Sequence, residues 1–115
     1  MQIQQVTNQP NFNGRVVFDP KTTYQLTKGM PEPLCKKIRE VAVLVSEKPY
    51  DIFVSRNAQD PTFYDIAANK TFEEAQKVKE YTVKVQTSIM QASIVDAAKD
   101  AIEMYEKYIS KSICG

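Results

Sequence analysis

The sequence contains no histidine, the side chain most often used as a general base near neutral pH. Catalytic triads and dyads that depend on histidine are therefore excluded. Glycine is also scarce. The three glycines, Gly14, Gly29 and Gly115, are too far apart to form the glycine-rich loops that hold the phosphates of nucleotides. Nucleotide binding through such loops is excluded as well.

Cysteine is nearly absent. Cys35 and Cys114 lie far apart in the sequence and have no Cys-x-x-Cys spacing. A structural zinc site usually takes four Cys or His ligands, and two cysteines without histidine do not supply them. We therefore expect free thiols, no bound metal and no cofactor.

Two acidic pairs are the remaining candidates for catalysis by carboxylates. Glu73 and Glu74 lie where a short helix is expected to begin, and carboxylates are favoured there in any case. Asp96 and Asp100 lie on the polar side of a longer predicted helix. Both pairs fit ordinary solvated positions, so we expect the protein not to be an enzyme.

The charge balance gives no strong electrostatic attraction to nucleic acid or to anionic lipid. Fifteen basic and fourteen acidic residues give a formal net charge of +1. Residues 1–20 lack the basic segment and following apolar segment of a secretory signal. No apolar run approaches the roughly 20 residues of a membrane span. We therefore expect a cytoplasmic protein that does not contact a membrane.

The longest regular pattern covers residues 88–113, where apolar side chains recur every three or four positions, as on one side of a helix. Ser88 and Gln91 have the spacing of a capping box at the start of this helix. Three alanines in the stripe would allow another layer to come close. The stripe comprises Met90, Ile94, Ala97, Ala98, Ala101, Ile102, Tyr105, Tyr108, Ile109 and Ile113.

The rest of the chain supplies shorter elements. Residues 12–19 predict a brief edge strand that ends before Pro20. Pro31 and Pro33 open a second helix with an apolar stripe that reaches Val45. Residues 50–56 and 62–68 alternate in polarity and predict a hairpin, and a short helix follows within residues 69–80.

Residues 81–87 are ambiguous, because they could join the short helix and the last helix into one span of about forty residues. The β-branched and aromatic side chains of this segment favour a strand instead. The sequence therefore predicts an α+β fold in the order β-α-β-β-(short α)-β-α. It has a small antiparallel β-sheet with two helices packed on one face. Residues 1–11 form a polar N-terminal arm, and residues 12–115 form a single domain.

Alternation divides the side chains of the predicted sheet between its two faces. The helix side would be lined by Tyr50, Ile52, Val54, Tyr64, Ile66, Ala68, Tyr81, Val83 and Val85. On the other side, Phe53 and Phe63 lie among polar residues. These two rings are either covered by the N-terminal segment, through Phe12, Val17 or Phe18, or exposed as a docking site. Base stacking on an aromatic sheet face is a third interpretation.

The last helix also outruns the sheet. It would be about 39 Å long at 1.5 Å per residue, whereas a strand of six residues spans roughly 20 Å. Its overhanging end could therefore mediate self-association or bind a protein partner. The predicted partner-binding residues on the two surfaces are Phe53, Phe63, Lys84, Tyr105, Tyr108 and Ile109.

The order α-β-β-β-α across residues 33–113 resembles that of a double-stranded-RNA-binding domain. This resemblance implies an alternative function in nucleic-acid binding, for which Lys36, Lys37, Arg39 and Lys84 are the candidate residues. The family has a lysine cluster at the start of its last helix, whereas residues 88–93 hold no basic residue. The family's Gly-Pro-His loop is also missing. We therefore expect a protein-binding or self-associating protein, with nucleic-acid binding as the alternative.

Overall fold

The computed structural model describes residues 13–19, 22 and 32–114. The predicted arm at residues 1–11 and Phe12 lie outside the described residues. The described chain forms an α+β fold, which confirms the predicted fold class and order. Its elements are β1 (Val16–Phe18), α2 (Glu32–Val45), β2 (Asp51–Arg56), β3 (Phe63–Asn69), α3 (Phe72–Lys77), the 3-10 turn η1 (Lys79–Tyr81), β4 (Val83–Gln86), the 3-10 turn η2 (Thr87–Ile89) and α4 (Met90–Cys114).

The four strands form one sheet in the order β1-β2-β3-β4. The β2–β3 and β3–β4 pairs are antiparallel, as predicted. β1 instead runs parallel to β2, with Val17 opposite Phe53. The expectation of an entirely antiparallel sheet is therefore wrong at this strand. The chain passes through α2 between β1 and β2, and such a crossover returns it to the sheet in the same direction.

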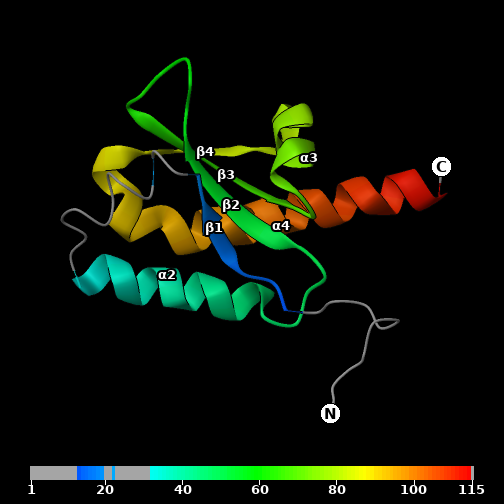
Figure 1. The fold of residues 1–115 in the computed structure, drawn as a ribbon, viewed down its shortest axis with the longest axis horizontal. Helices are drawn as coiled ribbons and strands as arrows, with labels where there is room; N and C mark the ends of the chain where they lie inside the picture. Colours follow the sequence, from blue (N-terminus) through cyan, green and yellow to red (C-terminus); the bar gives the residue numbers. More distant parts are fainter. Residues whose placement is uncertain (1–12, 20–21, 23–31, 115) are drawn as a thin grey trace, which may run out of the picture.

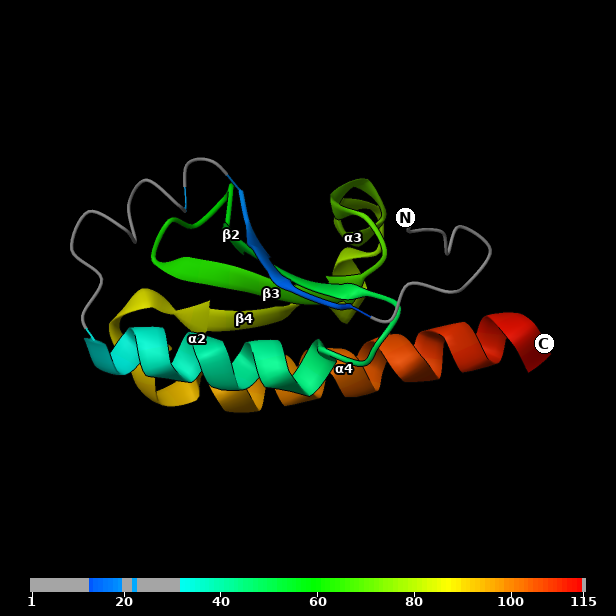
Figure 2. The same cartoon turned by 60° about the horizontal axis from the view of Figure 1, so that its bottom comes forward.

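The helices α2 and α4 lie side by side on one face of the sheet, as predicted (Figures 1 and 2). α2 contacts β1 and β2, whereas α4 contacts β3 and β4. α3 lies on the opposite face (Figure 2). α4 begins at Met90, after η2, and not at Ser88. No described helix combines the length and the apolarity that crossing a membrane requires.

The main core fills the space between the sheet and the two long helices. Ile52, Val54 and Ile66 from the sheet are fully buried against Val41 of α2 and Ile94 of α4. Ala98 and Ala101 of α4 are also fully buried, which is the close approach that the alanine-rich stripe predicts. The even-numbered residues of β2 and β3 therefore face the helices, as alternation requires.

The ambiguous segment is a strand, but a shorter one than predicted. Val83 and Val85 pair with Ile66 and Tyr64 of β3, so no continuous helix runs from α3 to α4. Tyr81 does not belong to the strand, because it ends the turn η1. Its ring lies 4.9 Å from the ring of Tyr108 on α4. The prediction that placed Tyr81 in the strand is therefore wrong, although its ring contacts the helix α4, as predicted for the helix side of the sheet.

Candidate protein-binding site

The outer face of the sheet carries a second, smaller apolar cluster around Phe53. Phe53 is only 6% exposed and packs with Ala67 and with Ala75 of α3. The ring of Phe72, also on α3, lies 5.8 Å from the ring of Phe53. Val17 of β1 packs against the same cluster. Phe53 therefore presents little surface to a partner while α3 covers it.

The cover over Phe53 differs from the one that the sequence suggested. Val17 contributes, as one interpretation proposed, but the adjacent Phe18 packs into the main core on the other face. α3 supplies most of the cover. Thr71 caps this helix, because its hydroxyl oxygen accepts a hydrogen bond from the backbone N–H of Glu74 at 3.1 Å. The capping pattern predicted the helix but not its location over Phe53.

The rest of the outer face is polar. Phe63 is half-buried, and Lys84 is exposed on the neighbouring strand. Asn57 Nδ2 donates to both carboxylate oxygens of Asp65, at 3.0 and 3.3 Å. The structure therefore brings Lys84 close to fixed polar groups, but it does not bring Phe53 and Phe63 together as an exposed aromatic pair.

The end of α4 extends past both α2 and the sheet (Figure 2). Tyr105 is buried there, and its ring meets that of Tyr50 in an edge-on contact at 4.8 Å. Tyr108 and Ile109 are half-buried. Of the three predicted residues on this helix, Tyr105 belongs to the core, whereas Tyr108 and Ile109 pack against its edge and keep part of their surface accessible.

Glu106 on α4 links this helix to the segment just before β2. Glu106 is half-buried, and it accepts hydrogen bonds from the Tyr50 hydroxyl at 2.6 Å and from Lys48 Nζ at 3.1 Å. The Tyr50 hydrogen bond, assisted by Lys48, lowers the pKa of the Glu106 carboxyl. Burial and the same carboxylate raise the pKa of Tyr50. The periodicity of α4 does not reveal this link, because Lys48 and Tyr50 belong to the distant segment between α2 and β2.

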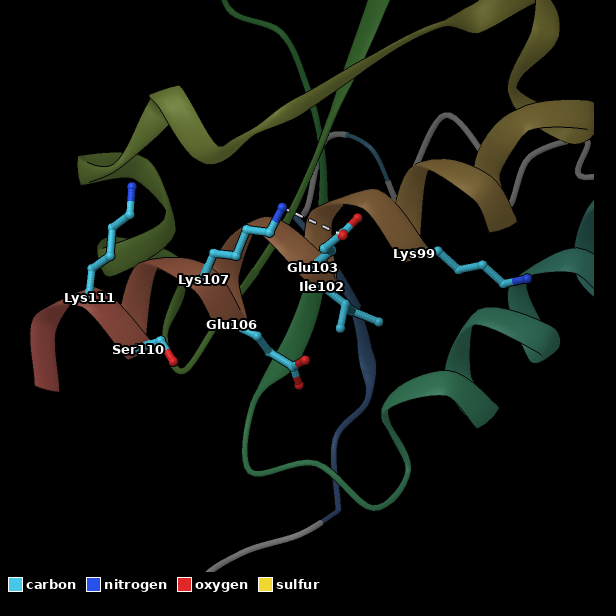
Figure 3. Close-up of a pocket in the computed structure, with 7 residues that line it drawn as sticks. All are labelled: Lys99, Ile102, Glu103, Glu106, Lys107, Ser110 and Lys111. Carbon is cyan, nitrogen blue, oxygen red and sulfur yellow. Dashed lines mark ion pairs between the residues drawn. The ribbon is translucent and has the colours of Figure 1, made fainter. Parts of the chain in front are cut away.

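A shallow groove of about 540 Å³ runs along the solvent side of α4 (Figure 3). Both basic and acidic side chains line it, and Lys107 Nζ lies 3.6 Å from a carboxylate oxygen of Glu103 in an ion pair. Ile102 supplies its main apolar surface. The groove is lined by Lys99, Ile102, Glu103, Glu106, Lys107, Ser110 and Lys111. This surface adjoins the overhanging end of the helix.

The basic residues proposed for nucleic-acid binding do not form one patch. Lys36, Lys37 and Arg39 belong to α2, whereas the side chain of Lys84 lies on the opposite face of the sheet. Two of the three α2 residues are ion-paired on their own helix. Lys37 Nζ lies 3.9 Å from Glu40 Oε2, and Arg39 Nη1 lies 3.8 Å from Glu32 Oε1. Positive charge on α2 is therefore partly balanced locally.

Within the described ranges, no group of three or more Cys, Asp or Glu side chains could hold a metal ion. Cys35 is a free, half-buried thiol on α2. The chain matches no family model, no curated protein and no solved structure. Functional inference therefore starts from the surfaces described above.

Proposed function

We propose that this is a small, non-catalytic protein of the cytoplasm that acts by binding another protein or a second copy of itself. The overhanging end of α4 is the proposed contact surface. The free thiol of Cys35 fits a reducing compartment.

The observation that carries the proposal is the length of α4. The helix continues to Cys114, beyond the end of α2 and of the sheet (Figure 2). At this end, Tyr108 and Ile109 are half-buried, and the charged groove around Ile102 lies alongside. An apolar centre with a charged rim is the usual composition of a protein-binding surface. Phe53 contributes less than the sequence suggested, because α3 covers it.

The test combines sedimentation equilibrium with affinity capture, using the wild-type protein and the variant Ile109→Ser. Ile109 also packs against the edge of the main core, so circular dichroism first confirms that the variant is folded at the temperature used. We expect the folded variant to lose at least part of the self-association or of the bound partner, because it removes apolar surface from the end of α4. Asp100→Ser is the control, since Asp100 is an exposed residue of the same helix and precedes Ile109 by more than two helical turns. A wild-type protein that stays monomeric and captures no partner, or a variant that behaves as the wild type does, would contradict the proposal.

Nucleic-acid binding remains the second candidate, favoured by the arrangement of α2, β2, β3, β4 and α4. Both long helices lie on one face of the antiparallel part of the sheet (Figure 2). A gel-shift experiment with RNA and DNA at low salt tests it, because contacts with phosphate are strongest there. The absence of any shift under those conditions would eliminate this candidate.

A further inference from the structure

β4 is the outer strand of the sheet, and its backbone pairing can be followed residue by residue. Just beyond its end, the backbone N–H of Thr87 donates to the carbonyl of Thr62 at 2.9 Å. Hydrogen-bonded and non-hydrogen-bonded pairs alternate along antiparallel strands. Val85 and Val83 therefore exchange hydrogen bonds with β3.

The residues between them face the other way. The backbone N–H and C=O groups of Lys84 and Gln86 point away from β3, toward the free edge of the sheet. The Gln86 carbonyl accepts the first hydrogen bond of the turn η2, for which Gln86 is the N-cap. The other three groups have no hydrogen-bond partner among the described residues. They form a short row of donors and acceptors with the geometry that an additional strand requires.

A hollow of about 310 Å³ lies on the outer face beside this edge. Lys84 from β4, Thr82 just before that strand and Asp65 from β3 line it. The hairpin loop and the turn η1 contribute the rest of its wall, namely Asn57, Ala58, Gln59, Lys79 and Glu80. In a strand added along β4, every second side chain would point to the face that contains this hollow.

The charges in the hollow are not equally available. Asp65 is already held by two hydrogen bonds from Asn57. Lys79, Glu80 and Lys84 are exposed, and none of the three forms an ion pair with any other residue that the structure describes. Of these three, only Lys84 belongs to the edge strand itself. A residue placed directly opposite Lys84 in an added strand would have its side chain about 5 Å away. An acidic side chain there would complement Lys84.

We propose that the free edge of β4 binds an extended segment of another protein that carries an acidic side chain opposite Lys84. Backbone hydrogen bonds to Lys84 and Gln86 supply the attachment, and Lys84 selects the charge. Lysine on an edge strand also discourages unselective pairing with apolar strands. This surface is separate from the end of α4, so its test is independent of the proposed function.

The probe is a fluorescein-labelled peptide in which valine alternates with threonine around one central glutamate, followed by fluorescence anisotropy. A second peptide carries lysine at the centre. We expect the wild-type protein to bind the glutamate peptide about twofold to fivefold more tightly than the lysine peptide, the usual range for one cross-strand charge pair. Lys84→Glu should reverse this preference. The matched control Lys36→Glu, on the other side of the molecule, should leave it unchanged.

Lys84→Pro tests the backbone contribution. The N–H that it removes points away from β3, so the variant should keep the thermal unfolding transition of the wild type while it loses about tenfold or more in affinity for both peptides. Equal binding to wild type and Lys84→Pro, or no binding of either peptide to the wild type, would overturn the proposal. So would a wild-type dimer that only this variant dissociates, because a second copy would then occupy the edge.

Discussion

At the scale of single residues, Gly14 lies where no side chain fits. A Cβ atom on Gly14 would collide with the backbone carbonyl oxygens of Val45 and Tyr50, which are not the ends of flexible side chains. The absence of a side chain therefore lets the entry to β1 pass close to the turn between α2 and β2. The sequence predicted a brief strand over residues 12–19, but it could not show this close approach.

We expect Gly14→Ala to lower the free energy of unfolding by about 1–3 kcal/mol, because the backbone must move to admit the methyl group. Urea denaturation measures the change. Glu47→Ala, an exposed substitution in the same turn, should alter stability by less than about 0.5 kcal/mol. A fully stable Gly14→Ala variant would show that this region adjusts freely.

Tyr50 joins two contacts, the hydrogen bond to Glu106 and the edge-on contact with Tyr105. Tyr50→Phe removes the first and retains the second. We expect a loss of about 1 kcal/mol at neutral pH, since part of the hydrogen bond is replaced by water at a half-exposed carboxylate. The control is Tyr81→Phe, because the Tyr81 hydroxyl forms no hydrogen bond with any residue that the structure describes. Thermal unfolding of the two variants separates this contact from a general effect of losing a hydroxyl.

The same hydrogen bond makes part of the stability depend on pH. The pKa of Glu106 is lower in the folded protein than its ordinary value of 4.5. Its stabilising contribution is therefore fully present above that ordinary value and is lost as the pH falls through the lowered, folded-state pKa. We expect the stability difference between wild type and Tyr50→Phe to shrink as the pH is lowered from 6 to 3. Urea unfolding curves across that interval measure it, and a constant difference would contradict the assignment.

At the scale of elements, α3 is the shortest α-helix among the described elements α2, α3 and α4 and is attached by few side chains. It has six residues, and it is attached to the sheet mainly through Ala75 and Phe72, the latter 39% exposed. Short helices are stabilised by packing and caps more than by intrinsic preference. The Thr71 cap is therefore a large part of what keeps α3 over Phe53.

We expect Thr71→Ala to cost about 1 kcal/mol and to act mainly on local opening of α3. Hydrogen exchange should rise at the backbone amides of α3, while the amides of β2 and β3 beneath the long helices change less. Gln76→Ala, an exposed change within the same helix, is the control. An equal rise in exchange throughout the sheet would show that α3 does not open separately.

The comparison between sequence and structure is also clearest at this scale. Periodicity was sufficient to predict α2, α4, the hairpin and the inward side of the sheet, because each depends on local alternation. It could not predict that β1 is parallel to β2 or that α3 covers Phe53, because both depend on contacts between distant segments. Tyr81 illustrates the same limit. Its neighbours alternate like a strand, but the backbone N–H of Tyr81 donates to Val78 and closes a turn.

At the scale of the whole molecule, the two apolar clusters lie on opposite faces of one sheet. Ile94 is fully buried in the larger cluster, between the sheet and the helices. We expect Ile94→Ala to lower the global free energy of unfolding by about 2–5 kcal/mol, because the shortened side chain leaves a cavity in the core between the sheet and the two long helices. The unfolding midpoint should fall by the same amount whether it is followed by circular dichroism or by tyrosine fluorescence. Separate shifts would show that the two faces unfold independently.

The parallel pairing of β1 also bears on the order in which the chain acquires its structure. β2 and β3 are joined by a short loop, so closing that hairpin costs little chain entropy, whereas β1 reaches β2 only across the whole of α2. The hairpin and the elements that follow it can therefore assemble before the N-terminal strand adds to their edge. Substitutions such as Val16→Ala should then accelerate unfolding and leave the refolding rate nearly unchanged. The strand that comes first in the sequence would be the last to join the sheet.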